Sequence, residues 1–180
     1  MKREFKYIQQ DTENISSSVK KWRMSKDSSQ ADKSSRSSRE SISTVDTPIL
    51  IVDDNRQYTD VLSKMLSGGF GYTNITISDE LEEAYEIVKQ NPDKFGLLFV
   101  DYNFPSGGTG GEFLLKLQAE NLLEGKIAFL ITSDPTIENV NEARKAGALG
   151  VVAKPFDRYE LTKQLEKAER AIRSLGVDSF

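Results

Sequence analysis

The sequence contains no cysteine and no histidine, and these two absences narrow the chemistry that the chain can perform. Without cysteine there are no disulfides, no thiolate metal site and no cysteine nucleophile. Without histidine the chain lacks the usual general base, the commonest metal ligand and any residue that could become phosphohistidine. Chemistry therefore has to come from carboxylates, hydroxyls and lysines.

Long apolar runs are also missing. No run approaches the roughly 18 residues that a membrane-spanning helix needs, and the opening MKREFKYIQQ lacks the apolar centre of a signal peptide. We expect a cytoplasmic protein and do not expect a membrane partner. The apolar fraction of 37% is low for a fully folded chain, so part of the 180 residues is expected to lie outside a packed core.

Charge divides the chain into two parts. Residues 1–46 carry ten Lys or Arg against seven Asp or Glu, whereas the remainder carries 14 basic and 21 acidic residues. An acidic globular part is a poor nonspecific binder of nucleic acid, so nucleic acid is not an expected partner.

Residues 1–46 are a predicted N-terminal arm. Apolar residues recur at spacings of three and four between Phe5 and Trp22, which favours a short amphipathic helix at 3–24. The SSS at 16–18 favours a disordered tail equally. Residues 25–46 are rich in serine and charge, which is typical of a linker. A helix at 3–24 could dock on a partner, on the chain's own folded domain or in a dimer.

From Pro48 onward, short β-favouring runs alternate with apolar residues at helical spacing. The predicted strands are 49–52, 72–77, 97–100, 127–131 and 151–153. The predicted inward-facing helix residues are Tyr58, Val61, Leu62, Met65 and Leu66; Leu81, Ala84, Ile87 and Val88; Phe113, Leu114 and Leu117; Ile137, Val140 and Ala143; and Leu161, Leu165, Ala168 and Ile172. Five such units predict an α/β domain at 47–176 with a doubly wound, five-stranded parallel sheet, the flavodoxin-like (βα)5 fold, and a tail at 177–180.

Local residues predict where some helices begin and end. The GGFG at 68–71 should end the first helix, and Ser78 should cap the second. Asp157 and Glu160 look like a capping box for the last helix, which Gly176 should end.

Polar residues stand at the ends of four predicted strands: Asp53, Asp54, Asp101, Thr132 and Lys154. The carboxyl ends of parallel strands share one edge of the sheet, where ligands bind. Three carboxylates there would repel one another, so they favour a hard divalent cation such as Mg²⁺. A lysine and a hydroxyl suit phosphoryl oxygens. The set predicts phosphoryl transfer to an aspartate.

The stretches ILIVDDN (49–55), LLFVDYNFP (97–105), FLITS (129–133) and GVVAKPF (150–156) resemble the response regulator receiver domains of two-component signalling. The resemblance implies that Asp101 accepts the phosphoryl group and that Asp54 binds Mg²⁺ directly. Asp53 would act through water or a hydrogen bond, and Asn103 would offer its backbone carbonyl to the metal.

The same resemblance implies that Thr132 is the switch hydroxyl and Lys154 the phosphoryl-binding lysine. The donor would be a histidine kinase or a histidine phosphotransfer protein. We expect a stand-alone receiver without an output domain, which signals to a downstream protein target through its fourth helix, fifth strand and fifth helix. It would be no enzyme beyond its own phosphorylation and dephosphorylation.

Three positions depart from the family pattern. The glycine expected eight residues after the acceptor is Thr109 here, and Gly111 is the apparent counterpart, which lengthens the loop at 106–111. Val151 replaces the usual aromatic residue three before the lysine, so the usual aromatic readout is not expected. Asp134, two after the threonine, is placed to influence the lifetime of the phosphoaspartate.

Other interpretations remain beside this one. Asp53 and Asp54 could cap the first helix, Thr132 could simply end a strand, and Lys154 could be a surface lysine. Together they could belong to a degenerate receiver that works as a phosphate-independent adaptor. A phosphohydrolase of the haloacid dehalogenase type is disfavoured, because it would need an aspartate where Asn103 stands.

Overall fold

The computed structural model describes residues 46–174, with side chains described up to residue 171. The predicted arm helix at 3–24, all of the linker at 25–46 except Asp46, and the tail at 177–180 lie outside the described residues. The predictions for Ile172 and Gly176 lie outside them as well. No helix in the described part is long and apolar enough to cross a membrane.

Five parallel strands form one sheet in the order β2-β1-β3-β4-β5, which confirms the predicted flavodoxin-like fold. The strands are β1 (Ile49–Val52), β2 (Ile75–Ser78), β3 (Leu97–Asp101), β4 (Ile127–Thr132) and β5 (Gly150–Ala153). Every residue of β1, β3 and β4 is buried, because the central strands of a doubly wound sheet are covered on both faces.

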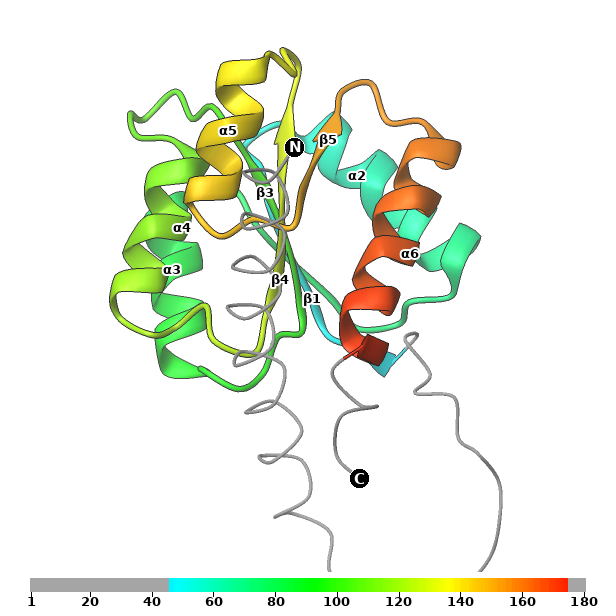
Figure 1. The fold of residues 1–180 in the computed structure, drawn as a ribbon, viewed down its shortest axis with the longest axis horizontal. Helices are drawn as coiled ribbons and strands as arrows, with labels where there is room; N and C mark the ends of the chain where they lie inside the picture. The colour runs from blue at the N-terminus through cyan, green and yellow to red at the C-terminus, as the bar shows by residue number, and fades with distance from the viewer. Residues whose placement is uncertain (1–45, 175–180) are drawn as a thin grey trace, which may run out of the picture.

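Helices cover both faces of this sheet (Figure 1). One face carries α3 (Leu81–Gln90), α4 (Gly110–Ala119) and α5 (Ile137–Lys145), and the other carries α2 (Arg56–Lys64), its π-helical extension η2 (Met65–Gly69), and α6 (Arg158–Ser174). The connection from β1 to β2 runs one way along the sheet, and the connections from β2 to β3, β3 to β4 and β4 to β5 run the other way. Because crossovers are right-handed, these two directions place their helices on opposite faces. The two directions separate between β1 and β3, where sheets of this type hold their ligands.

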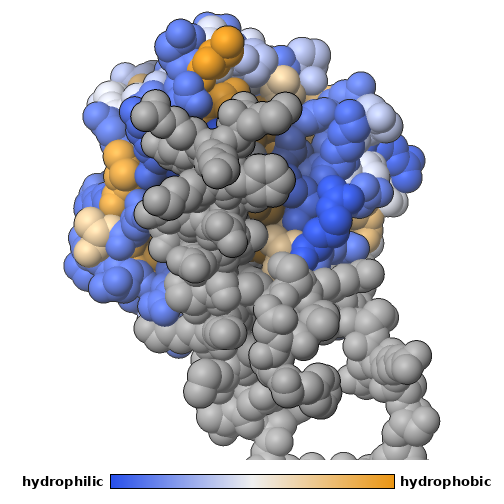
Figure 2. Space-filling view, viewed as in Figure 1, coloured by the Kyte–Doolittle hydropathy of each residue, from blue (hydrophilic) through white to orange (hydrophobic). Residues whose placement is uncertain are grey.

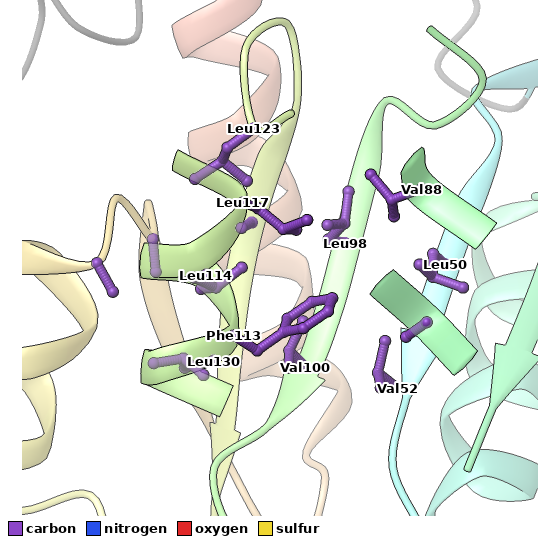
Figure 3. Close-up of a cluster of buried hydrophobic side chains, with 14 of the residues drawn as sticks. Leu50, Val52, Val88, Leu98, Val100, Phe113, Leu114, Leu117, Leu123 and Leu130 are labelled. Carbon is purple, nitrogen blue, oxygen red and sulfur yellow. The ribbon is translucent and has the colours of Figure 1, made fainter. Parts of the chain in front are cut away.

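Two hydrophobic cores hold the layers together. On the face of α3 and α4, side chains such as Leu50, Leu98 and Leu114 pack against one another (Figure 3). On the opposite face, Phe99 stacks on Phe129 with ring centroids 5.2 Å apart. Alternate residues of a strand point into different cores. A one-residue shift in the register of a strand would therefore turn each of its side chains toward the wrong core. The strands therefore deliver the residues at their ends to fixed places.

The first helix differs from its prediction in two ways. Val61 is 46% exposed, and Thr59 is buried in its place. The helical backbone also continues through the first two glycines of GGFG as η2, and the chain turns only at Gly71, whose φ of 82° suits glycine. The predicted burial of Leu62 and Leu66 is confirmed.

The prediction that Ser78 caps the second helix is wrong. Ser78 is the last residue of β2, paired with Val52, and Glu80 occupies the N-cap position of α3. The Ser78 hydroxyl instead donates to the Glu83 carboxylate at 2.6 Å. The pairing of Ser78 within the sheet thus prevails over the preference of serine for an N-cap position.

The later helices confirm most of their predicted inward faces. Ile137 is an exception at 77% exposure, because the first turn of α5 follows the exposed loop 133–135 and only Ala143 of this helix is fully buried. Asp157 caps α6 by accepting the Tyr159 N–H at 2.6 Å. The predicted capping-box partner Glu160 accepts from the Gln164 side chain instead.

Candidate functional site

Three aspartates converge at the carboxyl ends of β1 and β3. Their carboxylate oxygens lie within 4.8 Å of one another, although Asp53 and Asp54 are 47 or more residues away from Asp101 in the sequence. Asp53 and Asp101 are buried, with exposed fractions of 1% and 7%, whereas Asp54 is exposed. The predicted cluster is therefore present, with one carboxylate open to solvent.

Asp53 is held by the chain that follows it. One of its carboxylate oxygens accepts the Asn55 N–H at 2.9 Å. The cap of α2 is Asn55, whose side chain accepts the Gln57 N–H at 3.0 Å. The alternative interpretation, that Asp53 and Asp54 cap this helix, is therefore wrong, and both carboxylates remain available to the cluster.

Lys154 completes the cluster with a buried positive charge. Its ammonium lies 2.8 Å from an oxygen of Asp53 and 2.8 Å from an oxygen of Asp101, and its side chain is 5% exposed. The Lys154 N–H donates to the Thr132 carbonyl at 2.8 Å, which extends the pairing of β4 and β5 as far as the site. Lys154 is thus not a surface lysine.

Burial and neighbouring charges shift the pKa values of Asp101 and Lys154 in opposite directions. Burial raises the pKa of Asp101, and the neighbouring Lys154 offsets only part of that effect. Burial lowers the pKa of Lys154, but its hydrogen bonds to Asp101 and Asp53 outweigh this and leave the pKa above its usual value. The lysine is therefore charged at neutral pH, and a further cation beside Asp101 would favour the carboxylate form of that residue.

The donor set fits a divalent cation. Three carboxylates and one ammonium give the cluster a formal charge of −2. Carboxylate oxygens are the ligands that Mg²⁺ prefers, and the exposed Asp54 leaves room for the water ligands that Mg²⁺ usually retains. Such an arrangement can hold a hard cation next to an ammonium, which together suit the oxygens of a phosphoryl group.

Thr132 stands at the same edge but is engaged elsewhere. It is the last residue of β4 and is 2% exposed. Its hydroxyl oxygen accepts the Asp134 N–H at 3.1 Å and lies 3.3 Å from the Asp134 carbonyl. The hydroxyl thus holds the start of the loop between β4 and α5.

The loop after Asp101 is fixed by close backbone contact. A Cβ atom on Gly110 would lie 2.1 Å from the Asp101 carbonyl oxygen, and the Gly110 N–H donates to the Tyr102 carbonyl at 2.9 Å. At Gly111 the nearest atom would be at 3.4 Å, so Gly110, and not Gly111, is the position whose close contact requires glycine here. Asn103 forms a bridge with Thr109 and is exposed.

Several residues that shape this site were not identified from the sequence. Thr109 and Glu112 form a reciprocal capping box at the start of α4, which the T-x-x-E spacing could have indicated. Tyr58 places its ring under the Lys154 ammonium, 4.3 Å from centroid to nitrogen. The Tyr102 hydroxyl donates to the Glu142 carboxylate on α5. No periodicity or motif indicates either of these long-range contacts.

Comparison with known proteins agrees with this geometry. A family model described as the response regulator receiver domain matches residues 49–166. The chain is 30% identical over 119 residues to chemotaxis protein CheY of Pseudomonas aeruginosa, covering 66% of this chain and 93% of that protein. It is 32% identical over 117 residues to the putative two-component response regulator ARR13 of Arabidopsis thaliana, covering 64% of this chain and 19% of that protein.

Solved structures share the fold. Chemotaxis response regulator CheY4 of Vibrio cholerae matches with a TM-score of 0.60 and 23% sequence identity, covering 68% of this chain and 98% of that one. A receiver domain protein from Methanospirillum hungatei, described as CheY-like, matches with a TM-score of 0.61 and 24% identity, covering 72% of this chain and 98% of that one.

Proposed function

The chain belongs to the response regulator receiver family, and on that premise we propose that it accepts a phosphoryl group on Asp101 and signals by protein–protein contact. The observation that carries the proposal is the buried Lys154 ammonium, 2.8 Å from both Asp53 and Asp101, beside the open carboxylate of Asp54. A degenerate receiver has no need to keep a buried, charged cluster whose desolvation is costly.

In the proposed transfer, a carboxylate oxygen of Asp101 attacks the phosphorus of a phosphohistidine on the donor protein. A P–O bond forms, the P–N bond breaks, and its electron pair stays on the imidazole nitrogen, which takes up a proton. To end the signal, water attacks the same phosphorus and releases a proton to the solvent. The P–O bond to Asp101 then breaks with its electron pair on the Asp101 oxygen, which leaves the carboxylate and inorganic phosphate.

Asp53, Asp54 and Asp101, with the backbone carbonyl of Asn103, are the residues that would hold Mg²⁺. When bound, the ion would neutralise charge on the phosphoryl oxygens. Lys154 supplies a second positive charge to the same oxygens. The buried Asp53 orients the lysine, since it pairs with the ammonium and is itself fixed by the Asn55 N–H.

Phosphorylation would act on Thr132 and the loop that follows. The hydroxyl would exchange its contacts with Asp134 for a phosphoryl oxygen, which draws the start of that loop toward Asp101 and shifts an existing equilibrium. Val151 on β5 is a small aliphatic residue, so the shift would be transmitted without an aromatic rotation on that strand.

The face formed by α5, β5 and α6 is the proposed contact surface for a downstream protein. Two large side chains on it are exposed, Ile137 at 77% and Tyr159 at 67%. Figure 2 shows hydrophobic surface at the upper end of α5, which fits a protein partner. The donor would be a histidine kinase or a histidine phosphotransfer protein. We place the receiver at residues 47–176 and the arm at 1–46.

Intact-mass analysis tests the proposal. The full chain is incubated with Mg²⁺ and acetyl phosphate, beside Asp101→Asn. We expect one phosphoryl adduct on the wild type, none on Asp101→Asn, and none when EDTA removes the Mg²⁺. If the wild type stays unmodified while a known receiver reacts under the same conditions, the chain is a phosphate-independent adaptor and the proposal is wrong.

A further inference from the structure

The Lys154 ammonium has a third neighbour besides its two carboxylates. The ring of Tyr58, on the first turn of α2, lies with its centroid 4.3 Å from the nitrogen. Since the lysine side chain is only 5% exposed, this cation–π contact is largely shielded from water, which strengthens it. Tyr58 is therefore not simply part of the apolar stripe of its helix.

The Tyr58 ring is itself supported. Phe156, two residues after Lys154, meets it edge to face, with centroids 5.8 Å apart and planes at 81°. This geometry is the favourable one for aromatic pairs. The segment that carries the lysine therefore also fixes the ring that contacts the lysine.

The ring differs from the two carboxylates in one important way. Asp53 and Asp101 belong to the proposed Mg²⁺ and phosphoryl site, so a cation or a phosphoryl group competes with Lys154 for their oxygens. The ring offers no oxygen to the metal from its face, and its contact with the ammonium can persist when the carboxylates are engaged.

We infer that Tyr58 is a positioning residue that keeps the Lys154 ammonium aimed at the phosphoryl group while the carboxylates change partners. The inference rests on the proposed phosphoacceptor function. The ring acts through the lysine, which stabilises charge on the transferring group in both directions. Loss of the ring should therefore slow both the formation and the hydrolysis of the phosphoaspartate.

The test compares three variants of the full chain with acetyl phosphate and Mg²⁺. Tyr58→Leu removes the ring, Tyr58→Phe keeps it without the hydroxyl, and Phe70→Leu is the matched control. Phe70 also has a cation over its ring, the Arg158 guanidinium at 5.9 Å, but neither residue belongs to the acidic cluster. We expect Tyr58→Leu to lower both rate constants by about 3- to 30-fold, and Tyr58→Phe and Phe70→Leu to stay within about twofold of wild type.

A second readout does not depend on phosphorylation. In the Mg²⁺-free protein, the Lys154 methylene protons next to the nitrogen should show a ring-current shift in NMR spectra, assigned by its absence in Lys154→Arg. The shift should survive in Tyr58→Phe and disappear in Tyr58→Leu. Phe156→Leu, which leaves Tyr58 in place, should reduce both the shift and the rates by a smaller factor.

Several results would overturn the inference. These are an unshifted Lys154 signal in the wild type, equal rates in Tyr58→Leu and Phe70→Leu, a loss in Tyr58→Phe as large as in Tyr58→Leu, or faster hydrolysis in Tyr58→Leu. If the wild type forms no adduct at all, the proposed function fails and the role falls with it, while the NMR shift still decides whether the contact exists.

Discussion

The two loops that carry the carboxylates are built in different ways. The loop after β1 consists of Asp53–Asn55 only, and its own side chains fix it through hydrogen bonds of 2.9 and 3.0 Å. The loop after β3 runs from Tyr102 to Thr109 and is held at its ends, by the Asn103–Thr109 bridge and by the approach of Gly110 to Asp101.

The short loop is thus fixed by polar side chains within it, whereas the long loop is fixed mainly at its ends. The short loop places Asp53 through bonds that need specific polar side chains. The long loop leaves its tip at 105–108 exposed, with positive φ at Gly107 and Gly108. The proposed phosphorylation of Asp101 would use both features, namely an aspartate held in place at Asp53 and an exposed loop beside the new phosphoryl group.

The largest expected effect is that of Gly110→Ala, which attacks the anchor of the long loop. The new methyl group would lie 2.1 Å from the Asp101 carbonyl oxygen, so backbone on one side has to move. We expect urea unfolding to report a loss of about 3–5 kcal/mol. Phosphorylation by acetyl phosphate should fall with it, because the displaced backbone belongs to Asp101.

Gly111→Ala is the matched control, one residue along the same helix. Its methyl group would meet its nearest neighbour at 3.4 Å, and alanine favours a helical backbone over glycine. The change should leave stability within about 1 kcal/mol of the wild type. Equal losses in the two variants would contradict the assignment of the close approach to Gly110.

The next effect concerns Lys154, the lysine that pairs with Asp53 of the short loop. Lys154→Met removes the ammonium and leaves Asp53 and Asp101 buried beside each other, so unfolding in EDTA should show a loss of about 3 kcal/mol. Added Mg²⁺ should restore part of it by supplying the missing charge. Lys163→Met, at an exposed lysine on α6, should change stability by less than about 0.5 kcal/mol. No recovery with Mg²⁺ would count against a metal site at these carboxylates.

The same contrast explains what could be predicted from the sequence. The sheet and its edge follow from short apolar runs that end in Asp53, Asp101 and Lys154, because parallel strands bring their ends together whatever lies between them. Gly110 could not be distinguished from Gly111, since a 2.1 Å approach depends on where two distant backbones meet. The sequence likewise predicts Tyr58 only as an inward-facing helix residue. Helical periodicity does not show whether an inward-facing ring packs against apolar side chains or against a buried charge.

A smaller effect compares the caps that end the two loops. Asn55→Ala and Thr109→Ala each remove a side chain that accepts a backbone N–H at a helix start, at 3.0 and 3.1 Å. Each should cost about 1 kcal/mol in unfolding free energy. Thr109→Ala should slow phosphorylation more than Asn55→Ala. The backbone N–H bond from Asn55 to Asp53 survives the loss of the Asn55 side chain, whereas a loosened cap at Thr109 would weaken the backbone bridge with Asn103 that closes the long loop. A slower reaction in Asn55→Ala alone would reverse this comparison.

The smallest effect tests how the long loop is tied to α5. The hydrogen bond to the Glu142 carboxylate raises the pKa of Tyr102 above its usual value of 10.0. Since the folded state holds this proton more tightly than the unfolded state, the bond contributes stability that is complete below pH 10.0 and is lost as the pH rises through the higher folded pKa.

Tyr102→Phe should therefore lower stability by about 0.5 kcal/mol at neutral pH, and the difference from wild type should shrink above the usual tyrosine pKa. Thermal unfolding between neutral and alkaline pH measures this difference. In a Glu142→Gln background, whose amide carries no charge, Tyr102→Phe should show a weaker pH dependence. A constant difference across the whole range would mean that the Tyr102 hydroxyl and the Glu142 carboxylate are not coupled, and that this pair does not tie the long loop to α5.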